Sequence, residues 1–149
     1  MQAVVDFPSS QIFTQEEVRE KKLNLSFEVA SYEGATVLRC QGRIVFRDEA
    51  LALSAKVADL LPQSRQVVID LSGVETIDSA GLGELVVAFM SGQITSIPVK
   101  LASPNRLVRK ILEITNLNSV IEVYEQVKDA VTSRKSTVVA TAQGFGAGL

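Results

Sequence analysis

Hydrophobic and polar residues alternate along residues 23–29 and along the last four positions of residues 36–41. Alternation with a period of two places the apolar side chains on one face of an extended strand, so both stretches are predicted to be strands. They are separated by residues 32–35, in which Gly34 is available for a positive φ. The pattern therefore predicts an antiparallel hairpin.

Later in the chain the apolar residues recur every three or four positions, which is typical of amphipathic helices. The helical segments are residues 48–61, 79–92, 124–133 and a stretch that starts at Ser103-Pro104. Asp48 and Ser103 are placed to cap two of these helices. The residues predicted to face inward are Leu53, Val57, Leu60 and Leu61, then Leu82, Leu85, Val86, Phe89 and Met90, then Leu107, Val108, Ile111 and Leu112, and finally Val127, Ala130 and Val131.

Three short apolar runs between the helices, residues 67–71, 99–102 and 120–123, are predicted to be strands. The first is so continuous that both of its faces are expected to be covered, as in a parallel sheet. Parallel neighbours need right-handed crossover connections, and the intervening helices supply them. The sequence therefore predicts the α/β class, with a mixed, mostly parallel sheet of four or five strands flanked by helices.

The chain has 149 residues, which is enough for one domain with its own core and too few for two ordinary ones. The strand and helix pattern fills residues 23–133. Residues 1–22 are predicted to be an N-terminal extension with a short helix, because Thr14 and Glu17 can form a capping box. Residues 134–149 are small, polar and rich in glycine, and we expect a disordered tail.

The charge is nearly balanced, with 15 basic and 17 acidic residues and a net charge of −2. No basic block could follow a phosphate backbone, so nucleic acid is not an expected partner. The apolar stretches fall short of the roughly 20 residues that a spanning helix needs, so we expect no membrane segment. Residues 1–10 do not resemble a secretory signal, and a single cysteine cannot form an internal disulfide. Both observations favour a cytoplasmic protein.

The chain contains no histidine. Serine hydrolases, most zinc enzymes and phosphohistidine relays need an imidazole, so these classes are excluded. Cys40 lies in an apolar strand pattern with no histidine to activate it, and a buried structural thiol is predicted. We expect no metal and no cofactor, and a protein that is not an enzyme.

The segment of residues 67–85, VVIDLSGVETIDSAGLGEL, changes from strand to loop and then to a helix that begins near Ser79. A dinucleotide-binding turn would need a third glycine where Val86 stands, and a nucleophile elbow would need glycine in place of Ile77. An ordinary helix cap at Ser79 stays open. Gly81 and Gly83 are poor helix formers in a first turn, which suggests that another backbone approaches closely there.

The residues DLSGVETIDSAGLGEL resemble the signature of STAS domains, the fold of bacterial anti-sigma factor antagonists. The resemblance extends over residues 23–133, and Gly42 after the second strand also fits it. It implies that Ser79 is phosphorylated by a partner that is both anti-sigma factor and serine kinase, and dephosphorylated by a phosphatase. The residues that it implies for partner binding are Asp78, Ser79, Ala80, Gly81, Leu82 and Gly83.

The resemblance further implies a partner switch in transcription regulation, as in bacterial stress responses: unmodified Ser79 permits capture of the anti-sigma factor, which frees a sigma factor. Antagonists of this family commonly carry an acidic residue after the second strand, where this chain has Val45, and Asp48 is a candidate substitute. The alternatives are a scaffold component of a signalling assembly and a ligand-binding accessory subunit, neither of them phosphorylated. A homodimer is compatible with the sequence.

Overall fold

The computed structural model describes residues 23–133, which form one mixed five-stranded sheet. The strands are β1 (Leu25–Tyr32), β2 (Ala35–Ile44), β3 (Val67–Ile77), β4 (Val99–Ala102) and β5 (Val123–Tyr124), and they lie side by side in chain order. β1 and β2 form the predicted antiparallel hairpin, while β2, β3, β4 and β5 run parallel. The predicted class and the predicted mixed sheet are therefore confirmed.

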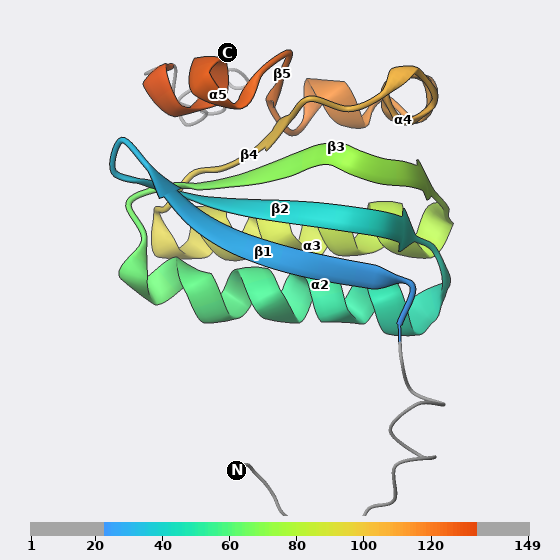
Figure 1. Cartoon of the computed structure of the whole chain (residues 1–149), viewed down its shortest axis with the longest axis horizontal. Coiled ribbons are helices and arrows are strands. Elements are labelled where there is room, and N and C mark those ends of the chain that lie inside the picture. The colour runs from blue at the N-terminus through green and yellow to red at the C-terminus, as the bar shows by residue number, and fades with distance from the viewer. Residues whose placement is uncertain (1–22, 134–149) are drawn as a thin grey trace, which may run out of the picture.

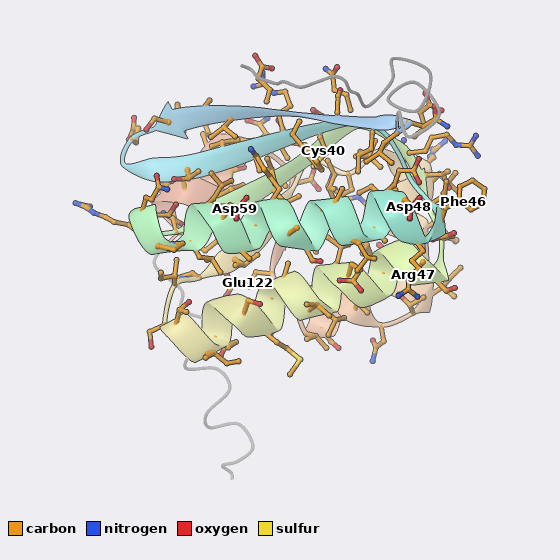
Figure 2. All side chains as sticks on the ribbon, turned by 90° about the horizontal axis from the view of Figure 1, so that it is seen from below. Cys40, Phe46, Arg47, Asp48, Asp59 and Glu122 are labelled. Atoms are coloured by element: carbon orange, nitrogen blue, oxygen red, sulfur yellow. The ribbon has the colours of Figure 1, made fainter. Side chains whose placement is uncertain are left out.

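Helices cover both faces of the sheet (Figure 1). The helices α2 (Phe46–Leu60) and α3 (Ser79–Thr95) lie together on one face, and Figure 2 shows them side by side. The helices α4 (Arg106–Ile114) and α5 (Val127–Thr132) lie on the opposite side. Short 3-10 helices span Leu61–Gln63 and Leu117–Ser119. α2, α3 and α4 supply the crossovers that the three parallel strand pairs require.

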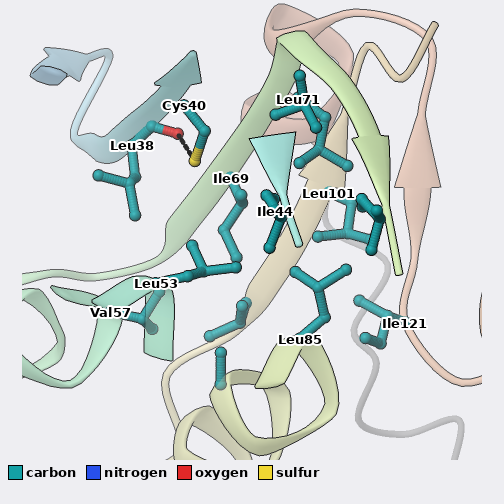
Figure 3. Close-up of a cluster of buried hydrophobic side chains, with 14 of the residues drawn as sticks. Leu38, Cys40, Ile44, Leu53, Val57, Ile69, Leu71, Leu85, Leu101 and Ile121 are labelled. Atoms are coloured by element: carbon teal, nitrogen blue, oxygen red, sulfur yellow. Dashed lines mark hydrogen bonds between the residues drawn. The ribbon is translucent and has the colours of Figure 1, made fainter. Parts of the chain in front are cut away.

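The main core packs the sheet against the α2–α3 layer (Figure 3), and the same cluster includes Val108 and Leu112 of α4. Leu53 and Val57 of α2 and Leu85 of α3 are fully buried against strand residues such as Ile69. Cys40 belongs to the same cluster, and its thiol donates a long hydrogen bond to the Leu38 carbonyl. Burial, with a smaller contribution from Asp70, raises the pKa of the Cys40 thiol to about 12, so the predicted structural thiol is confirmed.

Several predicted boundaries differ from the observed ones. β3 continues to Ile77, through residues that were predicted to be a loop, because residues 73–77 pair with the end of β2. β5 begins at Val123, whereas residues 120–122 precede it in a turn and an irregular segment. Capping differs too: α2 begins at Phe46 after Val45, not at Asp48, and α4 is capped by Asn105, not by Ser103.

Two residues predicted to face the core do not. Leu107 is 52% exposed and Met90 is 54% exposed, whereas Val108 and Leu85 on the same helices are fully buried. The apolar residues of α4 form one broad stripe, and Leu107 and Ile114 lie at its exposed edge, away from buried Val108 and Leu112. The packed face is set by the cap at Asn105, which also ties the helix start to the Val74 carbonyl of β3.

The predicted N-terminal helix and the predicted disordered tail lie outside the described residues, as do the boundaries of the extensions, residues 1–22 and 134–149. Within residues 23–133, none of the helices has the length and apolar character needed to span a membrane.

Candidate functional site

The segment singled out by the sequence lies where β3 ends and α3 begins. β2 and β3 are parallel neighbours, and their last residues, Ile44 and Ile77, are paired. The connections that leave them therefore start at the same end of the sheet, so that α2 and α3 also begin there. The Asp78 amide donates a hydrogen bond of 3.2 Å to the Ile44 carbonyl, which holds the two connections together.

The Asp78 carboxylate links the starts of both helices. Its Oδ1 accepts a hydrogen bond from the Gly81 amide at 3.0 Å, which is the N-cap bond of α3. Its Oδ2 accepts from the Phe46 amide at 2.9 Å, at the first residue of α2. These amides, Phe46 first and Gly81 second, stabilise the charged form and hold the pKa of Asp78 below its usual value. Asp78 is therefore an anionic cap that is already occupied by backbone donors.

Ser79 is exposed at the first residue of α3. The possibility that Ser79 itself caps this helix is wrong, because the cap is Asp78. Ala80 follows in the first turn and is partly exposed. The Ser79 hydroxyl is thus accessible at a helix N-terminus, where the helix dipole and free amide groups favour negative charge.

The two glycines of the first turn of α3 have different surroundings. A Cβ atom added to Gly81 would lie 2.4 Å from the Ile44 carbonyl oxygen, so the predicted close backbone approach exists and lies within the molecule. A Cβ atom on Gly83 would meet nothing within 4 Å, because Gly83 is exposed. Leu82, between them, is partly buried and packs against the core, so it adds little to the surface.

Phe46 is a component of this surface that the sequence did not predict. Its side chain is 67% exposed and its φ is +70°, a conformation that bulky residues rarely adopt. Figure 2 shows Phe46 projecting from the end of the molecule where α2 and α3 begin. An aromatic residue between Arg43 and Arg47 at a strand-to-helix connection was the available signal, but the predicted helix start at Asp48 left it in a loop.

Two positions considered for an acidic contact also lie here. Val45, the position at which the resemblance implies an acidic residue, is buried and immediately precedes α2. Asp48 is exposed in the first turn of α2. β2 continues to Ile44, and its residues Gly42 and Arg43 still pair with β3. The loop after the second strand is therefore shorter than predicted.

The groups present at the two helix starts limit the chemistry of the site. No group of three or more possible metal-ligating side chains occurs within residues 23–133. The carboxylate beside Ser79 accepts two amide hydrogen bonds and has a lowered pKa, which makes it a weak base for activating a hydroxyl. What the site offers instead is an accessible serine, open backbone at Gly83 and an exposed aromatic ring.

The fold and the site together define a small α/β domain that presents a serine at the start of a helix. A family model described as the STAS domain matches residues 26–130, and the chain therefore belongs to the STAS domain family. Homologues named as anti-sigma factor antagonists match it as well. The resemblance inferred from residues 70–85 is confirmed at the level of the family.

A candidate anti-sigma factor antagonist of Thermotoga neapolitana is 35% identical over 66 residues, which cover 44% of this chain and 58% of that protein. The crystal structure of a candidate anti-sigma factor antagonist from Thermotoga maritima has a TM-score of 0.60 at 26% identity, over 70% of this chain and 91% of that one. The phosphorylated form of the Bacillus cell fate determinant SpoIIAA has a TM-score of 0.54 at 16% identity, over 71% of this chain and 96% of its own. The last likeness shows the fold alone.

Proposed function

We propose that this protein is an anti-sigma factor antagonist that works as a phosphorylation-controlled partner switch at Ser79. The observation that carries the proposal is the exposed Ser79 at the first residue of α3, next to a carboxylate already engaged as the cap. Membership of the STAS family and homologues named as anti-sigma factor antagonists support the class. The SpoIIAA structure adds that this fold is compatible with a phosphorylated form.

In the unmodified state the surface around Ser79 accepts an anti-sigma factor that is also a serine kinase, and a sigma factor is released. The kinase then transfers the γ-phosphoryl group of ATP to the Ser79 oxygen, which loses its proton, and ADP leaves. The phosphate adds about 1.5 to 2 negative charges beside Asp78. Like charge and added bulk at the contact weaken binding, and a phosphatase restores the serine by hydrolysis. Ser79 is the substrate of these steps and no residue of this chain catalyses them.

The test uses two substitutions at Ser79 and candidate serine-kinase anti-sigma factors encoded in the source genome. Ser79→Ala should bind the partner persistently in the presence of ATP, because no phosphate can be added. Ser79→Asp should bind more weakly, because it places a charge next to Asp78. Since Asp78 and not Ser79 caps α3, both variants should unfold within about 0.5 kcal/mol of the wild type. Binding is measured by calorimetry and stability by circular dichroism.

The matched control is Ser72, an exposed serine on β3 outside the first turn of α3. Ser72→Asp should leave the affinity unchanged. Mass spectrometry of the protein from its native cell should find phosphate at Ser79 and not at Ser72. If Ser79→Asp bound every candidate as tightly as the wild type does and Ser79 never carried phosphate, the scaffold or the ligand-binding accessory role would replace the switch.

A further inference from the structure

Phe46 combines two properties that are unfavourable in a folded protein unless they serve contact with something else. Its ring is 67% exposed, although neighbouring Ile44 and Val45 are buried. Its φ of +70° lies in the left-handed region, which a side chain of this size adopts at a cost in free energy. A glycine would fit this backbone without strain, and a polar residue would suit the exposure.

The surrounding structure holds Phe46 in this conformation from both sides. The Asp78 carboxylate accepts the Phe46 amide at 2.9 Å, and the Asp78 amide donates to the carbonyl of Ile44 at 3.2 Å. Ile44 and Val45 anchor the preceding chain in the core. The ring is therefore presented outward on a fixed backbone, beside the helix start that carries exposed Ser79.

The charges around the ring indicate what kind of surface would cover it. Arg43 and Arg47 are exposed on either side of Phe46, and neither forms an ion pair within the part of the chain that the structure describes. Asp48 is the nearby exposed acid on α2, while the charge of Asp78 is engaged by two amides. Two arginines that form no ion pair with any described residue therefore stand three positions before and one position after Phe46 in the chain.

We infer that Phe46 is the aromatic anchor of the surface that recognises the anti-sigma factor, and that it enters an apolar pocket edged by carboxylates on that partner. The inference rests on the proposed function and names a specificity-determining residue for it. Aromatic side chains that fill a partner's pocket supply a large share of binding free energy, while rim charges mainly set the rate of association. Asp78 is then a positioning residue, because it fixes the backbone from which the ring projects.

The experiment compares Phe46→Gly with the wild type in the full chain, using purified serine-kinase anti-sigma factors encoded in the source genome as probes. Glycine relieves the left-handed strain, so the melting temperature should stay the same or rise. Affinity should nevertheless fall by about 30-fold or more, as for a residue at the centre of an interface. Phe46→Tyr should keep most of the affinity. A Phe46→Gly variant that is as stable as the wild type but binds more weakly has lost the contact with the partner and not the fold.

The matched control is Ile94→Ala, which removes an even more exposed apolar side chain, 82% exposed, near the far end of α3. Its affinity should stay within about twofold of the wild type, as expected for a residue outside the interface. A second pair of variants tests the charges. Arg47→Glu should slow association with the anti-sigma factor, most strongly at low ionic strength. Lys110 is exposed on α4, and Lys110→Glu should leave the association rate unchanged.

The outcomes distinguish this inference from the proposed function. Suppose that the wild type binds a probe and that Ser79→Asp weakens this binding but Phe46→Gly does not. The role of Phe46 as an anchor would then be wrong, while the partner switch at Ser79 would stand. Equal losses in Phe46→Gly and Ile94→Ala would also overturn the anchor, because exposed apolar residues in general would then be responsible. If the wild type bound none of the probes, both the switch and the anchor would fall.

Discussion

The helices α2 and α3 on one face of the sheet and α5 on the other face are attached by different kinds of contact. On the α2–α3 face, Leu53, Val57 and Leu85 have no exposed surface, and one buried charged residue of α2, Glu49, accepts a hydrogen bond from the Asn24 amide. On the α5 face, the apolar cluster is small, and buried Asp70 and Lys100 lie among its residues.

The polar residues on the second face form directional contacts. The Lys100 ammonium donates to the carbonyls of Ala130 and Ser133, at 2.8 and 3.1 Å, where α5 ends. Asp70 accepts from the Arg39 guanidinium at 3.3 Å and from the Ser72 amide at 2.9 Å. α2 and α3 are held mainly by apolar packing, whereas α5 is held by a small apolar cluster together with the hydrogen bonds from Lys100. The candidate site begins on the layer that is fixed by packing, which suits a surface whose shape must be preserved.

The largest effect is expected on the aliphatic face. Leu85→Ala should lower the free energy of unfolding by about 2 to 5 kcal/mol, because it opens a cavity among fully buried side chains. Leu107→Ala makes the same chemical change on α4 at a residue that is 52% exposed, and it should cost less than about 1 kcal/mol. Chemical denaturation of both variants measures the difference. Similar losses would mean that the burial of Leu85 does not contribute more to stability than the exposed Leu107 side chain does.

The second effect concerns the polar face. Lys100→Met keeps the side-chain length but leaves the Ala130 carbonyl without its buried ammonium donor, so the free energy of unfolding should fall by about 1 to 3 kcal/mol. Amide hydrogen exchange should increase in α5 and stay unchanged in α3. The matched control is Lys110→Met, at an exposed position of α4. An unchanged α5 in Lys100→Met would show that packing by Val131 and Ala130 is sufficient to hold that helix.

The sequence predicted the apolar face better than the polar one, for a physical reason. Period-two and helical patterns report burial of apolar side chains, and they correctly placed the hairpin and the inward face of α2. Lys100 lies in a short apolar strand, and no local pattern shows that its ammonium reaches the end of α5. That contact depends on residues about 30 positions apart, which come together only in the folded sheet.

In the candidate site, too, local patterns were predicted correctly and contacts between distant residues were missed. Ser79 and the glycines were found from local motif spacing, and the structure places them at one helix start. The cap was assigned differently because Asp78 and Ser79 are both good capping residues, and only the backbone geometry selects one. Phe46 was missed because its conformation depends on a hydrogen bond from its amide to a carboxylate 32 residues later.

Asp78 makes directional hydrogen bonds within the α2–α3 layer, which is held mainly by packing. Asp78→Ala removes both capping bonds and should lower the free energy of unfolding by about 0.5 to 2 kcal/mol at neutral pH. The pKa of Asp78 is depressed in the folded state, so its stabilisation is present above the unfolded value of about 4 and is lost as pH falls through the folded value. The difference between wild type and variant should therefore shrink below about pH 4. A pH-independent difference would mean that the charge of Asp78 is not what stabilises the helix starts.

The smallest expected effect is an increase in the free energy of unfolding. It distinguishes a glycine of α3 that packs inside the molecule from one that faces solvent. Gly83→Ala adds a methyl group in open space, so it should raise the free energy of unfolding by about 0.5 to 1 kcal/mol through better helix propensity. Gly81→Ala, two residues earlier, directs its methyl group against the Ile44 carbonyl and should destabilise the fold. Thermal melts of the pair measure both signs. If a partner backbone approaches α3 at Gly83, the more stable Gly83→Ala variant should also bind the anti-sigma factor more weakly. Unchanged affinity would place that partner's backbone away from Gly83 and leave Gly83 with no role in binding.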